Sequence, residues 1–71
     1  MHPATTAILR HFVWEHLPPH LQVIYQPICE LAHRMAETLP EGPEVTAGLR
    51  KLLEAKDCLV RAAVPPEAPG V

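Results

Sequence analysis

The stretch Pro40-Glu41-Gly42-Pro43 decides how this chain folds, because it separates two long helical patterns. Pro40 ends the first pattern, Gly42 permits a left-handed backbone, and Pro43 suits the first turn of a new helix. A link this short joins antiparallel neighbours. We therefore expect an antiparallel αα-hairpin at the centre of the fold, with one long helix on each side of the break.

The residues before the break, 19–39, predict the first long helix. Apolar side chains recur there every three or four positions, which is the period of one helical face. Pro19 suits the first helical turn. Pro27 removes a hydrogen bond to the carbonyl of Val23, so the helix either kinks near Val23 or becomes regular only at Pro27. The unbroken apolar stripe favours the kink; it consists of Leu21, Ile24, Tyr25, Ile28, Leu31, Ala32, Met35, Ala36 and Leu39.

The residues after the break, 43–64, predict the second long helix. Glu44 in its first turn and Arg61 near its end both complement the helix dipole. Pro65-Pro66 stops the helix, and we expect residues 65–71 to form a disordered tail. Residues 1–64 then form a single helical-hairpin domain. The apolar arc of this helix consists of Val45, Leu49, Leu52, Leu53, Leu59, Val60 and Ala63.

Residues 1–17 predict a short helix of two to three turns, with Thr5 or Thr6 as its cap. Ile8 and Phe12 form an i,i+4 apolar pair within it, and the helix must stop before Pro18-Pro19. The expected fold class is all-α, a short N-terminal helix plus the antiparallel αα-hairpin, assembled into a homo-oligomer.

Size and charge narrow the functional classes. A chain of 71 residues holds one small domain, and such a core seldom supplies more than about 3–5 kcal/mol of stability on its own. Two cysteines do not make a disulfide framework, so self-association is the favoured source of added stability. A net charge of −2 argues against DNA binding. No apolar run is long enough for a membrane span and no signal peptide is recognised, so we expect a cytosolic protein.

Lys56 is the most unusual polar residue, because at about 100° per residue it points into the middle of the apolar arc of helix 43–64. A cation there forms an ion pair, snorkels past its neighbours, or reaches a bound anion. Glu30 and Glu37 of a partner helix are the candidate carboxylates.

A charged stripe on the same helix is open to two interpretations. Its residues pair at i,i+4 with opposite signs, which is typical of a solvated face with weak ion pairs. Alternatively, Arg61 binds phosphate, because its guanidinium fork matches phosphate oxygens. The stripe consists of Arg50, Glu54, Asp57 and Arg61.

The turn formed by residues 12–19 combines aromatic side chains, a histidine and two prolines. Because the prolines fix the backbone, Trp14 and His16 are suited to stack on a base or contact a phosphate. The alternative is that Phe12 and Trp14 cap the open end of the hairpin core while His16 caps backbone groups.

Catalysis and metal binding have little support. Cys29 and His33 are spaced i,i+4, but nothing orients the histidine and no oxyanion hole is evident. His16 and His20 share that spacing across two prolines that forbid a regular helix. We expect neither an enzyme nor a metal site, and no cofactor.

Four features in order resemble small actinobacteriophage proteins. They are the run Phe12-x-Trp14-x-His16-x-Pro18-Pro19, a 20-residue helix, the Pro-Glu-Gly-Pro break, and a last helix ending Leu52-Leu53-Glu54-Ala55-Lys56-Asp57-Cys58-Leu59-Val60-Arg61-Ala62-Ala63. Those are similar to the helical-hairpin domain of phage anti-CBASS and anti-Thoeris sponges, over residues 12–64. The resemblance implies a viral immune-evasion protein of the host bacterial cytoplasm. Such a protein sequesters cyclic di- or trinucleotide signals between the protomers of a homo-oligomer, often a hexamer.

The resemblance also assigns candidate residues. Trp14 or His16 stands where the family stacks an aromatic on a base. Gln22 and Gln26 lie nearest the family's phosphate-binding lysine, and Lys56, or Arg34 of a neighbouring protomer, is the candidate replacement. Arg61 matches the arginine of a second, cyclic-trinucleotide site. The full candidate set is Trp14, His16, Pro18, Gln26, Arg34, Lys56 and Arg61.

Two alternatives of other classes stay open. One is a nucleic-acid accessory protein that uses the last helix; it predicts a steep salt dependence of binding to linear DNA, and the mixed-sign charged stripe argues against it. The other is a small helical interaction or scaffold module, assembled with other helices and without a small ligand, which fits the same amphipathic pattern. It predicts that Lys56 faces a carboxylate.

Overall fold

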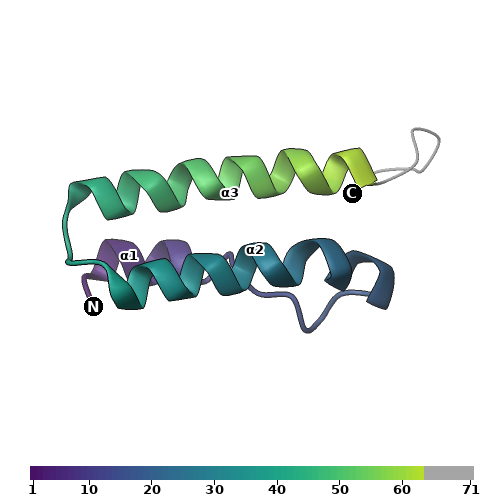
Figure 1. Cartoon of the computed structure of the whole chain (residues 1–71), viewed down its shortest axis with the longest axis horizontal. Helices are drawn as coiled ribbons and strands as arrows, with labels where there is room; N and C mark the ends of the chain where they lie inside the picture. The colour runs from purple at the N-terminus through teal and green to yellow at the C-terminus, as the bar shows by residue number, and fades with distance from the viewer. Residues whose placement is uncertain (64–71) are drawn as a thin grey trace.

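The computed structural model describes residues 1–63, which form three helices and no strand. Helix α1 spans Pro3–Leu9, α2 spans Pro19–Thr38, and α3 spans Pro43–Ala63 (Figure 1). The prediction of an all-α chain is therefore confirmed. The predicted tail at 65–71, and Val64 at the predicted end of the domain, lie outside the described residues.

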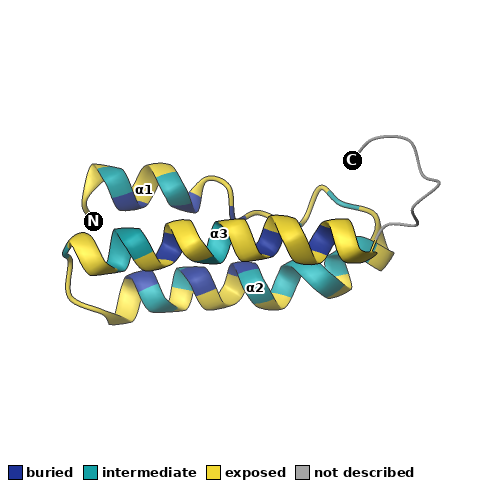
Figure 2. Cartoon of the chain, turned by 90° about the horizontal axis from the view of Figure 1, so that it is seen from above, coloured by how far each residue is buried: buried dark blue, intermediate teal, exposed yellow. Residues whose placement is uncertain are grey.

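Helix α3 is the element on which the other two pack. It lies beside α2 along most of its length, and α1 contacts it from another side (Figures 1 and 2). The chain turns back between α2 and α3 within residues 39–42. The short link therefore places the two long helices next to each other.

Helix α1 has about two turns, within the expected length, but it ends before Phe12 and has a different cap. His2, rather than Thr5 or Thr6, is the cap, since its Nδ1 accepts a hydrogen bond from the backbone N–H of Ala4 at 3.0 Å. The Thr5 side chain is instead buried, and its hydroxyl donates to Glu41 at 3.3 Å. The helix ends at Leu9, so the prediction that it includes Phe12 is wrong.

Helix α2 runs without interruption through Pro27. The alternative in which the regular helix starts only at Pro27 is therefore wrong, and Pro19 is the first helical residue as expected. The helix stops at Thr38, where the Leu39 backbone turns extended while its N–H still donates to the carbonyl of Met35. An extended residue before Pro40 is what the proline ring demands.

The core is small and is built around an aromatic residue that belongs to no helix. Phe12 is 1% exposed and is among the largest fully buried side chains. The buried residues of α2 are the short side chains Cys29, Ala32 and Ala36, and the buried positions of α2 and α3 are seen in Figure 2. The buried cluster consists of Leu9, Phe12, Cys29, Ala32, Ala36 and Leu49.

Among residues 1–63, no helix combines the length and the apolar character that crossing a membrane requires.

Candidate functional site

The connecting segment, residues 10–18 between α1 and α2, is fastened to the body by three side chains. Gln22 of α2 donates to the carbonyls of Leu17 at 2.7 Å and Glu15 at 3.2 Å. The Nε2 atom of His33, also on α2, lies 3.1 Å from the carbonyl oxygen of Phe12. Lys56 of α3 supplies the third contact. Both long helices therefore fix the backbone that carries Trp14.

Lys56 is buried by residues of its own chain. Its side chain is 6% exposed, and Nζ donates to the carbonyl of His11 at 2.6 Å. The same ammonium lies 5.4 Å from the ring centre of Phe12 and 5.1 Å from that of Tyr25, so both rings contribute cation–π attraction. The expected ion pair with Glu30 or Glu37 is therefore wrong, and so is the expectation of a snorkelling stem.

This arrangement explains how a lysine is tolerated in the core. A buried cation is costly unless it is hydrogen-bonded. The His11 carbonyl supplies that hydrogen bond, and the rings of Phe12 and Tyr25 lie near the same ammonium. Within residues 1–63, no buried side-chain nitrogen or oxygen is left without a partner.

A cavity of about 600 Å³ lies between the connecting segment and α2, and we call it the turn cavity. Trp14 is half-buried and packs against the core, while Arg34 is exposed at the rim. Three carboxylates share the cavity with the single arginine, so its charge in one copy is negative. Its lining consists of Phe12, Val13, Trp14, Glu15, Cys29, Glu30, His33, Arg34 and Glu37.

The other candidate residues lie outside the turn cavity. His16 is exposed, Pro18 is the residue before α2, and Gln26 donates to Glu30 at 3.4 Å. Lys56 is committed to the His11 carbonyl. One copy of the chain therefore brings together only Trp14 and Arg34 of the predicted set.

Arg61 lies in a separate hollow of about 240 Å³, with Tyr25, Asp57 and Val60. Its guanidinium donates to Cys58 Sγ at 3.4 Å rather than to Asp57, the partner that the i,i+4 spacing suggests. Burial raises the pKa of the Tyr25 hydroxyl, and the negative charge of Asp57 adds to the shift. Arg61 itself is exposed, with the Tyr25 phenol and the Asp57 carboxylate beside it.

Gln22 has a structural role that the sequence analysis did not predict. The apolar pattern places it on the outer face of the helix, yet its amide holds two carbonyls of the connecting segment. Its position could have predicted this role, because Gln22 lies about one turn after Pro18-Pro19, where a long amide side chain reaches back to the preceding segment.

Cys29 and His33 do not form an activated nucleophile. Burial raises the pKa of the Cys29 thiol; Lys56 partly opposes this, and the carboxylates of Glu15 and Glu30 reinforce it. A thiol that stays protonated is a poor nucleophile. The His33 Nε2 atom is already taken by the Phe12 carbonyl.

We expect the two thiols to differ in reactivity. Cys29 is buried and Cys58 is exposed. At pH 8, Ellman's reagent should therefore titrate one thiol per native chain quickly and the second at least about tenfold more slowly, because only an accessible thiolate reacts. In denaturant both should react at once. Equal rates for both thiols in the native protein would contradict the burial of Cys29.

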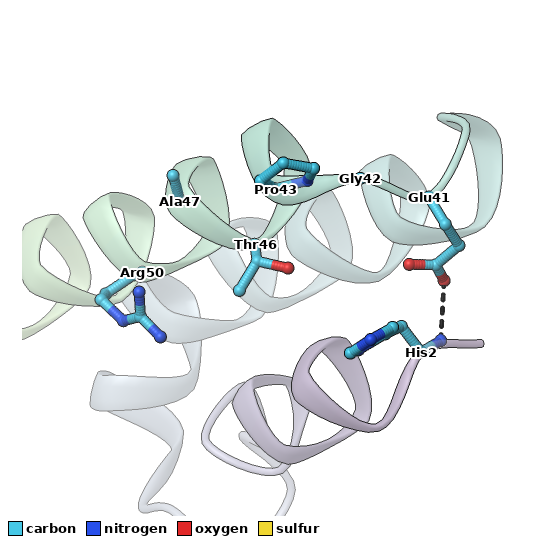
Figure 3. Close-up of a pocket in the computed structure, with 7 residues that line it drawn as sticks. All are labelled: His2, Glu41, Gly42, Pro43, Thr46, Ala47 and Arg50. Atoms are coloured by element: carbon cyan, nitrogen blue, oxygen red, sulfur yellow. Dashed lines mark hydrogen bonds between the residues drawn. The ribbon is translucent and has the colours of Figure 1, made fainter.

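A third cavity, of about 390 Å³, lies beside the link between α2 and α3 (Figure 3). There Glu41 accepts hydrogen bonds from the backbone N–H of His2 at 3.0 Å and from the Thr5 hydroxyl at 3.3 Å. The carboxylate thus ties α1 to the link between α2 and α3. None of the predicted candidates lines this cavity, which includes His2, Glu41, Thr46 and Arg50.

Within residues 1–63, no three histidine, cysteine or acidic side chains gather as a metal site would require. Comparisons with protein-family models, curated proteins and solved structures find no match to this chain.

Proposed function

We propose that this chain binds cyclic di- or trinucleotides without degrading them, in sites shared between the copies of a homo-oligomer. The antiparallel αα-hairpin of α2 and α3 is its structural unit, and a hexamer is the favoured assembly. In this proposal it is a bacteriophage protein that acts in the host cytoplasm. It withdraws the signal on which CBASS-type immunity depends.

The observation that most supports the proposal is the fastened connecting segment. Three side chains from two helices hold carbonyls on both sides of Trp14. Burying a charge has a desolvation cost, so stability alone is a weak reason for a lysine in this core. Fixing an aromatic plane in advance lowers the entropy lost when a base stacks on it.

The size of the turn cavity agrees with this use. At about 600 Å³ it falls in the range of small-ligand pockets, which is about 300–1,000 Å³. Its three carboxylates, however, repel phosphate in a single copy. The proposal therefore requires cations from a neighbouring copy. The exposed arginines of the candidate set are Arg34 and Arg61.

Calorimetry with a panel of cyclic di- and trinucleotides tests the proposal. We expect saturable heat with at least one cyclic ligand, at fewer than one ligand per chain, and none with the linear oligonucleotide of the same bases. Trp14→Ala should weaken binding about 5- to 150-fold, since stacking contributes about 1–3 kcal/mol per base. No heat across the whole panel would remove the function.

Arg61 has a matched control on its own helix. Arg61→Ala should abolish cyclic-trinucleotide binding while leaving the assembly intact, because a guanidinium pairs with phosphate through two hydrogen bonds. Arg50→Ala removes an exposed arginine from the same charged stripe and should bind as wild type. If Arg61→Ala dissociates the assembly, Arg61 is structural and has no place in the ligand site.

A second candidate is an interaction module that binds other helices and no small ligand. The exposed apolar residues of α2 and α3, among them Leu31, Leu39 and Leu59, favour it. The burial of Lys56 against a carbonyl rather than a carboxylate counts against the form that the sequence predicted. Calorimetry without heat, together with stable self-association, would favour this candidate.

A further inference from the structure

Helix α3 carries a second apolar face that its own chain leaves largely uncovered. Leu49, Lys56 and Val60 point inward and are buried. A separate row of apolar or small residues follows spacings of three, four, three, four and three, which is the heptad pattern of a helix–helix seam. We call it the α3 seam; it consists of Val45, Gly48, Leu52, Ala55, Leu59 and Ala62.

The α3 seam is exposed over most of its length. Leu59 is 53% exposed, and Gly48, Ala55 and Ala62 are exposed as well. Only Val45 and Leu52 are half-buried, at the end where α2 contributes Leu31, Met35 and Leu39 to an apolar groove of about 300 Å³. The seam runs for about 25 Å at 1.5 Å per residue, long enough to receive another helix.

Gly48 leaves open space on the seam, with room for the close approach of another helix. Glycine is the least favourable residue in a helix interior apart from proline. Within this chain nothing requires it, because a Cβ at Gly48 would meet no atom within 4 Å. A glycine in a helix lets another backbone or side chain approach closely, because it has no Cβ.

The seam is complementary to itself in one orientation. Large and small residues alternate along it, from Gly48 and Leu52 to Ala55, Leu59 and Ala62. When two copies of the seam run antiparallel with Leu52 opposite Ala55, Gly48 falls opposite Leu59. Val45 then falls opposite Ala62, so every layer pairs a larger residue with a smaller one, as a well-packed interface requires. A parallel pair in register would instead set Gly48 against Gly48.

Charge favours the same register over its neighbour. Lys51 flanks the seam on one edge, and Cys58 follows one heptad later. With Leu52 opposite Ala55, Lys51 of one copy lies across from Cys58 of the other. Sliding the helices by one heptad, so that Gly48 faces Leu52, sets Lys51 against Lys51 and leaves Leu59 uncovered. Like charges in direct opposition are unfavourable.

We propose that a second copy of this chain covers the α3 seam, its own α3 laid antiparallel so that Gly48 of each copy receives Leu59 of the other. This inference rests on the self-association included in the proposed function, but not on any nucleotide ligand. It names the surface and the register through which two copies join.

Sedimentation of the ligand-free protein over a range of concentrations tests the seam. The wild type should self-associate. Leu59→Glu should raise the dissociation constant at least about 100-fold, because it places a carboxylate in an apolar layer. Val23→Glu, at an apolar α2 residue that is 73% exposed and off the seam, should associate as wild type. Circular dichroism confirms that each variant is folded.

Gly48→Leu separates the antiparallel register from the parallel one. Opposite Leu59 the added side chain overfills a layer and should weaken association about tenfold or more. The double variant Gly48→Leu with Leu59→Ala should restore it. Stronger association of Gly48→Leu alone would overturn the register, since a parallel pair has a void there to fill.

The outcomes for the seam and for the ligand are distinct. A wild type that stays monomeric at every concentration, or a Leu59→Glu variant that associates normally, overturns the seam. Association through the seam without binding heat from any cyclic nucleotide supports this inference while removing the proposed function.

Discussion

Phe12→Ala should lower the free energy of unfolding by about 3–5 kcal/mol, the usual cost of truncating a fully buried phenylalanine. A domain of this size has about 4–11 kcal/mol in total, at about 0.05–0.15 kcal/mol per residue. Phe12 contacts the core cluster and the Lys56 ammonium, so its loss opens a cavity and removes a cation–π partner. Urea unfolding at a fixed protein concentration, followed by circular dichroism, measures the effect.

The neighbouring residue is the matched control. Val13 is 44% exposed, and Val13→Ala should cost less than about 1 kcal/mol. Phe12→Leu keeps most of the apolar volume and should fall between the two. A loss below about 1 kcal/mol for Phe12→Ala would mean that the connecting segment does not pack on the helices as described.

The two long helices were predictable because their signals are local. Apolar periodicity marked α2 and α3, and Pro19, Pro40 and Pro43 marked where they begin and end within a residue or two. Those signals act over one or two turns and need no knowledge of the rest of the chain. Pro27 lies inside α2 without ending it, as the unbroken apolar stripe predicted.

The connecting segment was not predictable because its partners are distant in sequence. The contact between Lys56 and His11 spans 45 residues, and that between His33 and Phe12 spans 21. The angular position of Lys56 showed correctly that it points inward. Angle alone does not reveal whether a carboxylate, a ligand or a carbonyl meets it there.

The candidate site residues, too, were predictable in kind but not in their grouping. Trp14 and Arg34 come together because the segment folds back over α2, whereas Arg61 lies in another hollow near the end of α3. The sequence marks which residues carry suitable chemistry. It does not mark which of them share a cavity, since that depends on tertiary contacts and, in the proposed function, on a second copy.

Lys56→Ala should lower the free energy of unfolding by about 2–4 kcal/mol, although lysine is a polar residue. It truncates a buried side chain whose ammonium lies near the rings of Phe12 and Tyr25, and it removes the donor to the His11 carbonyl. Lys51→Ala, at an exposed lysine of the same helix, should change the stability by less than about 0.5 kcal/mol. Equal effects of the two substitutions would contradict the buried position of Lys56.

Lys56→Met distinguishes the contribution of Lys56 to core packing from its contribution to the position of Trp14. It keeps an unbranched side chain of similar length, so most of the stability should remain, with a loss of about 1 kcal/mol for the missing donor. The connecting segment should become more mobile, because one of the three side chains that hold it is gone.

Trp14 is the only tryptophan of the chain, so its fluorescence reports on this segment alone. We expect its emission to shift to longer wavelength in Lys56→Met and to stay unchanged in Lys51→Met. An unchanged spectrum in both variants would show that Lys56 stabilises the core without positioning Trp14, which would remove the main support for a preformed stacking surface.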